Sequence, residues 1–143
     1  MAHIERTALV AFSAEKMFAL VNDIEAYPQY MEGCKGAEVL EKSEHEVVAR
    51  LDLSKAGISH SFVTRNQLTP PESMTMALEE GPFSRLQGEW RFQVLAEDAC
   101  KVSLQLDFEF SSKLLAMAAG KWFESVANQL VDGLVQRAQT VYG

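Results

Sequence analysis

The pattern that most constrains the fold runs from Gly33 to Phe110, where apolar and polar residues alternate with the two-residue period of β-strands. Short turn sequences such as Pro70-Pro71 and Glu97-Asp98 interrupt it and predict six strands, at about 36–42, 45–54, 57–68, 73–79, 84–96 and 99–110. Because the turns are short, we expect neighbouring strands to pair in chain order as an antiparallel sheet. The last two strands each have one apolar face that should pack on a core: Leu86, Gly88, Trp90, Phe92 and Val94, and then Val102, Leu104, Leu106, Phe108 and Phe110.

The chain ends in a segment, residues 113–142, that contains no proline and predicts one long amphipathic helix. A helix of this length extends about 45 Å, enough to cross the concave face of a curved sheet. Its apolar residues recur at intervals of three and four and should face that sheet: Leu115, Ala119, Trp122, Phe123, Val126, Leu130, Leu134 and Ala138.

The N-terminal region predicts one more strand, at residues 3–12, and a helical region before the main sheet begins. Ser13 can cap a helix that Tyr27-Pro28 should end or kink, with a second helical turn from Asp23 to about Met31. The predicted order is β-α-α-β6-α, an α+β fold with a seven-stranded curved antiparallel sheet around the C-terminal helix. No linker-like composition divides the chain, so we expect a single domain over residues 1–143.

Charge and composition argue against several classes of protein. The formal net charge of −7 argues against a generic nucleic-acid binder, and so against DNA as a partner, because such proteins carry an excess of Lys and Arg. The sequence has neither the apolar core of a signal peptide nor a membrane-spanning stretch, so we expect a cytoplasmic protein without stable membrane insertion. Cys34 and Cys100 lie far apart and outside any CxxC pair, which favours two free thiols over a zinc site or a disulfide.

Motifs for enzymatic chemistry are absent from the sequence. It contains no P-loop, dinucleotide-binding glycine motif, HExxH or GxSxG sequence. His3, His45 and His60 lie at the N-terminus, in a turn and in a strand, and their positions suggest no triad or ligand cluster. We therefore expect a binding protein with no catalytic residue, no metal site and no required cofactor.

The predicted architecture favours an apolar cavity, because a curled sheet cannot follow a straight helix closely at every point. Small residues gather near the start of the helix, where Ala119 and Gly120 precede Trp122 and Phe123. This cluster has two equally supported interpretations, close packing of helix on sheet and the wall of a cavity. In the second case we expect Trp90 and Trp122 to share a space of roughly 300 to 1,000 Å³, the size of small-ligand pockets.

Short segments distributed over the whole chain match the pattern of a known family. They are Ser13-Ala14-Glu15-Lys16-Met17-Phe18, Val21-Asn22-Asp23, Tyr27-Pro28-Gln29-Tyr30, Gly33-Cys34, Lys55-Ala56-Gly57-Ile58, Phe62-Val63-Thr64-Arg65-Asn66-Gln67-Leu68, Gly81-Pro82-Phe83, Gly88-Glu89-Trp90-Arg91-Phe92, Leu106-Asp107-Phe108-Glu109-Phe110 and Arg137-Ala138-Gln139-Thr140-Val141-Tyr142. Each segment alone is weak, but together they resemble the bacterial ribosome-association toxin family and its coenzyme-Q-binding relatives. One departure is Met31-Glu32, where many relatives have Leu-Pro.

The resemblance implies a helix-grip fold of the steroidogenic-acute-regulatory-protein-related lipid-transfer (START) type. It also implies binding to the 50S ribosomal subunit, inhibition of 70S formation and a small antitoxin protein as partner. From the coenzyme-Q-binding relatives it implies a cavity that holds ubiquinone or another lipid and supports respiration. These two hypotheses can coexist. A third, a cyclase-like enzyme, needs polar groups in the cavity, where the inward positions offer little beyond Thr64, Asn66 and Tyr30.

Two sets of candidate binding residues follow from this reading. An acidic protein needs a local group of cations to contact a ribosome, and the candidates are Arg50, Lys55, Arg65 and Arg91. We expect the cavity ligand to contact Tyr27, Tyr30, Phe62, Thr64, Phe83, Leu86, Trp90, Phe92, Leu106, Phe108, Leu115, Ala119, Trp122, Phe123 and Val126.

Overall fold

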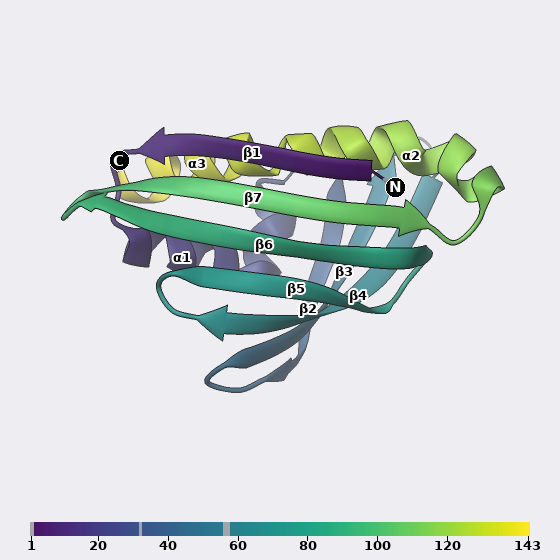
Figure 1. The fold of residues 1–143 in the computed structure, drawn as a ribbon, viewed down its shortest axis with the longest axis horizontal. Coiled ribbons are helices and arrows are strands. Elements are labelled where there is room, and N and C mark those ends of the chain that lie inside the picture. Colours follow the sequence, from purple (N-terminus) through teal and green to yellow (C-terminus); the bar gives the residue numbers. More distant parts are fainter. Residues whose placement is uncertain (1, 32, 56–57) are drawn as a thin grey trace.

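The computed structural model describes residues 2–31, 33–55 and 58–143, with the side chains of Lys55 and Ile58 left outside the description (Figure 1). It confirms the predicted α+β fold and the order of its elements. The helices are α1 (Ala14–Asn22), the 3₁₀ helix η1 (Ile24–Gln29), α2 (Lys113–Asn128) and α3 (Leu130–Tyr142). The strands are β1 (Ala2–Val10), β2 (Cys34–Lys42), β3 (Glu46–Lys55), β4 (Ile58–Thr69), β5 (Ser73–Glu80), β6 (Phe83–Ala96) and β7 (Ala99–Phe110).

The seven strands form one antiparallel sheet in the order β1-β7-β6-β5-β4-β3-β2. From β2 to β7 the strands pair in chain order, as their short turns predict. The first strand pairs instead with the last, from Ala2 opposite Phe108 to Val10 opposite Cys100. The sheet curls so strongly that β2, β3 and β4 run across the direction of β6 and β7 in Figure 1. This curl creates the concave face on which the helices lie.

The N-terminal helices close one part of that concave face. Ser13 caps α1 as predicted, because its Oγ accepts a hydrogen bond from the amide of Lys16 at 3.2 Å. Met17 and Val21 are fully buried where α1 meets α3, β6 and β7. Pro28 lies within η1, which ends at Gln29 and packs on β2. The predicted second helical turn is therefore present and slightly shorter than expected.

The C-terminal helix is divided at Gln129 into α2 and α3, which lie end to end behind β1 in Figure 1. Ser112 caps α2 by accepting the amide of Leu115 at 3.1 Å. At the junction, the amide of Gln129 donates to the carbonyl of Val126 at 3.1 Å, the three-residue spacing of a tighter 3₁₀ turn. The buried stripe continues across this junction, through Phe123, Ala127, Val131, Leu134 and Ala138.

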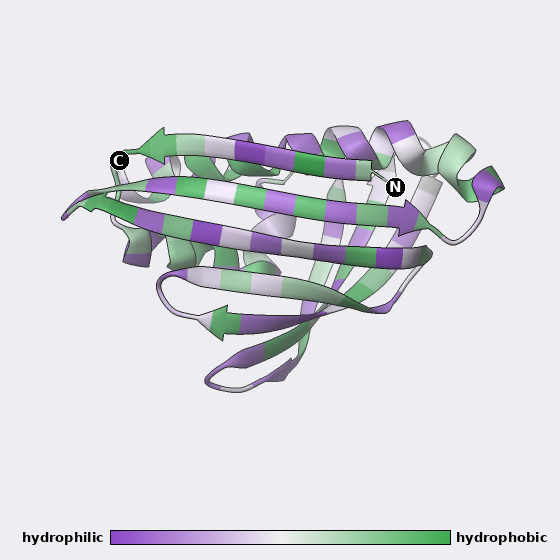
Figure 2. Cartoon of the chain, viewed as in Figure 1, coloured by the Kyte–Doolittle hydropathy of each residue, from purple (hydrophilic) through white to green (hydrophobic). Residues whose placement is uncertain are grey.

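The predicted alternation of hydropathy is visible along β6 and β7 in Figure 2. On the concave side, Val102 and Leu104 are fully buried. Val94 differs from its prediction as a core residue, because 66% of its surface is exposed. It lies near the end of β6, where the β6–β7 hairpin extends beyond the helices (Figure 1). The helices thus determine how much of each apolar strand face becomes core.

Candidate functional site

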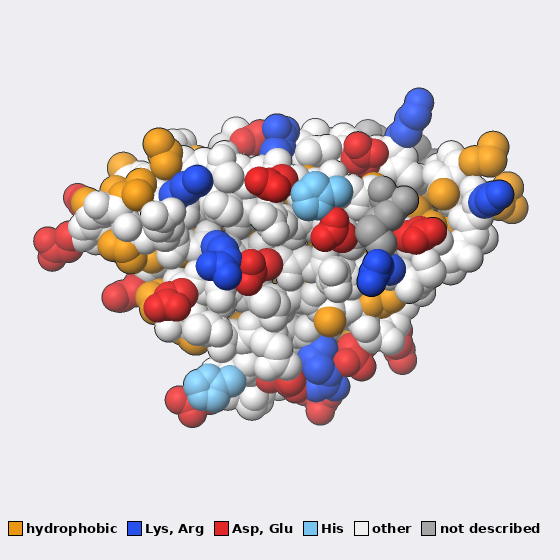
Figure 3. Space-filling view, in the orientation of Figure 1, with side chains coloured by type: hydrophobic (Ala, Val, Ile, Leu, Met, Phe, Trp, Pro, Cys, Tyr) orange, Lys and Arg blue, Asp and Glu red, His pale blue; other side chains and the backbone are white. Residues whose placement is uncertain are grey.

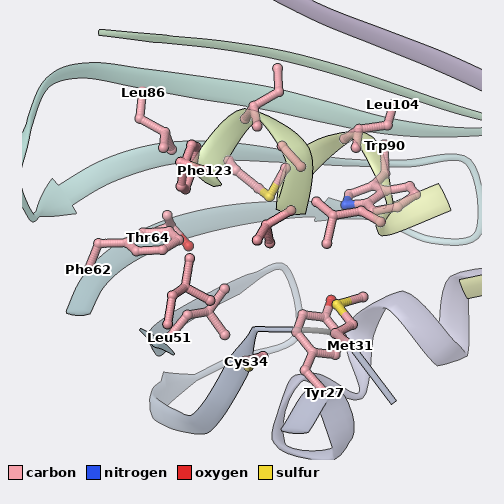
Figure 4. Close-up of a pocket in the computed structure, with 16 residues that line it drawn as sticks. Tyr27, Met31, Cys34, Leu51, Phe62, Thr64, Leu86, Trp90, Leu104 and Phe123 are labelled. Atoms are coloured by element: carbon pink, nitrogen blue, oxygen red, sulfur yellow. The ribbon is translucent and has the colours of Figure 1, made fainter. Parts of the chain in front are cut away.

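An apolar cavity lies between the concave face of the sheet, η1 and the junction of α2 with α3 (Figure 4). Its volume of about 90 Å³ is well below the roughly 300 to 1,000 Å³ expected of a small-ligand pocket. Large side chains such as Trp90 and Phe123 occupy much of the space beneath the helix. The lining residues are Tyr27, Met31, Cys34, Leu51, Leu53, Phe62, Thr64, Met76, Leu86, Trp90, Leu104, Leu106, Phe123, Val126, Ala127 and Leu130.

The polar groups in the cavity wall are poorly suited to catalysis. The hydroxyl of Tyr27 donates a hydrogen bond to the carbonyl of Val21, and burial raises the pKa of this phenol well above its usual value. The Sγ of Cys34 lies 3.4 Å from the carbonyl oxygen of Gly36, and burial raises the pKa of the thiol. Both groups therefore stay protonated at neutral pH, where neither is a strong nucleophile or base. With the hydroxyl of Thr64, these two groups give the cavity wall few polar side-chain atoms. The cavity is therefore suited to an apolar ligand with few polar atoms of its own.

The structure brings together about half of the residues that the sequence suggested as ligand contacts. Those that line the cavity are Tyr27, Phe62, Thr64, Leu86, Trp90, Leu106, Phe123 and Val126. Phe92 and Phe108 are buried in the core, and Leu115 is half-buried on the first turn of α2. Of the three polar residues that the cyclase-like hypothesis considered, Thr64 lines the cavity, whereas Asn66 and Tyr30 do not line it.

Three further candidates, Phe83, Ala119 and Trp122, line a separate space of only about 10 Å³. This small space shares Leu53, Phe62 and Phe123 with the cavity. The prediction that Trp90 and Trp122 share one cavity is therefore wrong. The rings of Phe62 and Phe123, whose centroids are 6.2 Å apart, lie between the two spaces.

The small residues near the start of α2 do not form the cavity wall. Ala119 is buried against the small space, and a Cβ added at Gly120 would meet only Phe110, at 3.9 Å. Close packing therefore does not require glycine at this position. The cavity lies about two turns further along α2, beside Ala127.

Half of the lining residues escaped prediction, although some could have been found by pairing the strands. Leu51 lies opposite Phe62 in the β3–β4 register, and Leu104 lies opposite Trp90 in the β6–β7 register. Cross-strand partners point to the same face, so each pair enters the cavity together. The remaining residues that were missed are Met31, Cys34, Leu53, Met76, Ala127 and Leu130.

A polar groove of about 370 Å³ adjoins the cavity at the α2–α3 junction. The groove and the cavity share Met31, Val126 and Leu130, so these side chains separate the cavity from solvent at this point. Tyr30, a predicted ligand residue, lines the groove instead, with the Arg137 guanidinium 5.1 Å from its ring centroid. Burial raises the pKa of the Tyr30 hydroxyl, whose oxygen has no hydrogen-bond partner among the described residues. The groove thus borders the cavity across these three shared side chains.

The predicted ribosome-contacting arginines lie on the outer face of the sheet, beside carboxylates. Arg65 donates from Nε to Glu79 at 2.6 Å and from Nη1 to Glu46. Hydrogen bonds from Gln67 and Arg65 lower the pKa of Glu46, so this carboxylate is charged at neutral pH. The Arg65 side chain is thus already engaged by two acids.

Arg50 and Arg91 are paired in the same way. Arg50 lies 3.3 Å from Asp52, and Arg91 lies 2.8 Å from Glu89. Figure 3 shows acidic and basic side chains interspersed over this face rather than gathered by sign. Lys55, the fourth candidate, ends β3, and its side chain lies outside the described residues.

Neither a metal-binding cluster nor a membrane-spanning helix occurs in the described part of the chain. There, no group of three or more His, Cys, Asp and Glu side chains could hold a metal ion. Over the same ranges, none of the helices is both long and apolar enough to span a membrane. His3 forms an exposed pair with Asp107, at 2.5 Å, which raises the pKa of the imidazole. This pair lies on the outer face, away from the cavity.

The curled sheet, the long helix and the apolar cavity define a helix-grip domain of the lipid-transport type. The sequence profile of the family described as "Polyketide cyclase / dehydrase and lipid transport" matches residues 10–135. Ribosome association toxin RatA from Vibrio cholerae serotype O1 is 52% identical over 143 residues, covering 100% of this chain and 99% of the relative. The chain therefore belongs to the ribosome association toxin family within that larger group.

Two more distant proteins show how widely the fold is used. The mitochondrial coenzyme Q-binding protein coq10 of Schizosaccharomyces pombe is 26% identical over 137 residues, covering 92% of this chain and 83% of that protein. The crystal structure of the Zhui aromatase/cyclase from Streptomyces sp. R1128 has a TM-score of 0.79 at 22% identity, covering 99% and 98% of the two chains. The second comparison shows the fold alone. The predicted fold and family resemblance are both confirmed.

Proposed function

We propose that this protein is a cytoplasmic, non-enzymatic protein that binds the 50S ribosomal subunit and prevents the 30S subunit from joining it. The supporting observation is the 52% identity, over the full length of this chain, to a protein named as a ribosome association toxin. The alignment covers 100% of this chain, so it spans every strand and helix of the domain. A small antitoxin protein is the second partner in this proposal.

Electrostatics restrict how an acidic protein can approach a ribosome. A net charge of −7 is repelled by ribosomal RNA at long range, so favourable contact must come from a few cations and from contacts with ribosomal protein. Arg50, Arg65 and Arg91 are held beside carboxylates that a phosphate would also meet. These arginines are therefore weaker candidates than the sequence suggested, and we assign the electrostatic contact to Lys55 on its charge in the sequence alone.

A co-sedimentation experiment tests this assignment. At a salt concentration of about 0.1 M, we expect the protein to pellet with 50S subunits and not with 30S subunits. Lys55→Glu should reduce the pelleted fraction. Arg65→Gln is the matched control and should behave as the wild type, because Glu46 and Glu79 already occupy its guanidinium. Equal losses in both variants, or a wild-type protein that stays in the supernatant, would contradict the assignment.

The cavity and the similarity to coq10 support a second function, binding of ubiquinone or a related lipid. At about 90 Å³ the cavity is too small for a substituted quinone ring, so lining side chains must move when a ligand enters. Met31 and Met76 are suited to this, because methionine is flexible and repacks readily. The hydroxyl of Thr64 is a suitable donor to a quinone carbonyl oxygen.

The positions of the two tryptophans allow a direct test of this second function. Trp90 lines the cavity and Trp122 does not, so a short-chain ubiquinone analogue should quench Trp90 emission saturably. The quenching should persist in Trp122→Phe and disappear in Trp90→Phe. Non-saturating quenching in the wild type, or saturable quenching that depends on Trp122 alone, would count against a ligand in this cavity.

A further inference from the structure

The first turns of α2 carry an exposed apolar surface that neither proposed function uses. Leu114 is 78% exposed and Met117 is 84% exposed, the highest values for large apolar side chains among the described residues. They lie three positions apart, hence on one face of the helix, with exposed Ala118 beside them. In Figure 3, apolar side chains gather at the end of the molecule where Figure 1 shows α2 beginning.

Lysines flank this apolar surface on both sides. Lys113 precedes it and Lys121 follows one turn later, and both side chains are exposed. No acidic residue occurs in the sequence between Glu109 and Glu124, although acidic residues outnumber basic ones in the chain by 20 to 13. We call the group Lys113, Leu114, Met117, Ala118 and Lys121 the α2 tip. It combines exposed apolar side chains with a local positive charge in an otherwise acidic protein.

We propose that the α2 tip docks reversibly on the surface of an anionic phospholipid bilayer. Leu114 and Met117 would enter the boundary between headgroups and acyl chains, as the apolar face of an interfacial helix does. The stems of Lys113 and Lys121 are long enough to place their ammonium groups beside lipid phosphates. Apolar residues with flanking lysines thus complement both layers of such a surface.

Two other occupants fit the α2 tip less well. An RNA would engage the lysines but gain little from exposed aliphatic side chains, because proteins stack RNA bases on aromatic rings and arginine. A second copy of the chain would bury only a few residues on each side, whereas a stable protein interface buries about 800 Å² per partner. A bilayer needs no preformed complementary surface.

Apolar side chains connect the α2 tip with the cavity. Behind the tip, Phe110 and Trp122 line the small space, and Phe123 lines both this space and the cavity. The ring centroids of Phe110 and Phe123 are 5.9 Å apart. Docking would therefore bring the aromatic side chains that border the cavity close to the membrane. A role for them in ligand entry rests on the proposed lipid binding, whereas docking itself does not.

Vesicle flotation tests the docking proposal. We expect the wild type to float with vesicles of phosphatidylethanolamine and phosphatidylglycerol, and more weakly with vesicles of phosphatidylcholine. Removing the apolar part with Leu114→Ser and Met117→Ser together should reduce partitioning at least about tenfold, since each residue loses apolar burial. Lys113→Gln with Lys121→Gln should reduce binding to the anionic vesicles about tenfold and weaken its salt dependence.

A matched control uses the opposite end of the sheet. Leu9 and Val94 are also exposed, at 74% and 66%, but the nearby β6–β7 turn carries Glu97 and Asp98. Leu9→Ser with Val94→Ser should therefore leave vesicle binding unchanged. Every variant should retain the wild-type circular dichroism spectrum, because all these side chains are exposed.

Several results would overturn the proposal. One is a wild-type protein that does not float with anionic vesicles at low salt, and another is an equal loss of binding in the control variant. A third is a wild-type dimer, detected without vesicles, that the Leu114 and Met117 substitutions abolish, because the tip would then bind a second copy. A fourth is a variant with both Lys113→Gln and Lys121→Gln that loses 50S co-sedimentation but floats as the wild type. These lysines would then contact the ribosome and not the membrane. Failure of the ribosomal experiments alone would leave the docking result standing.

Discussion

Separated 30S and 50S subunits mixed with an excess of the purified protein should fail to form 70S particles, while 70S particles assembled beforehand should remain largely intact. The asymmetry follows if the protein occupies a surface of the 50S subunit that the 30S subunit covers in the joined ribosome. Sucrose-gradient profiles of both mixtures provide the measurement. A 70S peak of unchanged height in the first mixture would contradict the proposed mechanism.

The variants for this experiment can be chosen from the ion pairs. Lys55→Glu should restore the 70S peak, and Arg65→Gln should still suppress it. Arg65→Glu is a poor choice, because it would place a new carboxylate beside Glu46 and Glu79 and destabilise the sheet by repulsion. Trp90→Phe should suppress the 70S peak as strongly as the wild type if ribosome binding is independent of the cavity. Suppression by Lys55→Glu at the wild-type dose would remove Lys55 from the contact.

The sheet was largely predictable because its strands carry a strong local pattern. The alternation in β6 and β7 and the short turns of the meander determine both the strands and their pairing in chain order. The pairing of β1 with β7 joins residues nearly a whole chain apart, and nothing in the pattern of β1 identifies its partner. Alternation within β6 also placed Val94 in the core. Its exposure could not be predicted from the strand alone, because it depends on where the helices end.

The site was less predictable because it depends on distances between elements. Helical spacing identified the apolar stripe that contains Phe123 and Val126, but it could not show which turn leaves a gap above the sheet. That gap lies beside Ala127 rather than Ala119. The arginines were recognised as exposed, yet their carboxylate partners come from neighbouring strands. Arg65 meets Glu46 of β3 and Glu79 of β5 only through the register of the sheet.

The substitution with the largest expected effect on stability is Phe123→Ala. The Phe123 ring is buried and lies among the rings of Phe62, Phe83, Phe108 and Phe110, with centroid distances of 6.2, 5.1, 4.7 and 5.9 Å. Truncating such a residue removes its burial and leaves a void, which together lower the free energy of unfolding by about 3 to 5 kcal/mol. Denaturant unfolding followed by circular dichroism measures this change. Leu114→Ala on the same helix is the matched control and should change stability by only about 0.5 kcal/mol, because its side chain is exposed.

The same variant should also respond more strongly to a cavity ligand. Phe123 lies between the cavity and the small space beside Trp122, so removing its ring should join them into one larger space. A ligand that binds only the folded state raises stability in proportion to the logarithm of its concentration over its Kd. A short-chain ubiquinone analogue should therefore raise the Tm of Phe123→Ala more than that of the wild type, because entry no longer requires large side chains to move. An equal rise in Tm in the two proteins would indicate that the analogue binds elsewhere. This comparison holds however much stability the variant has lost without ligand, because each rise is measured from the same protein's own unliganded Tm.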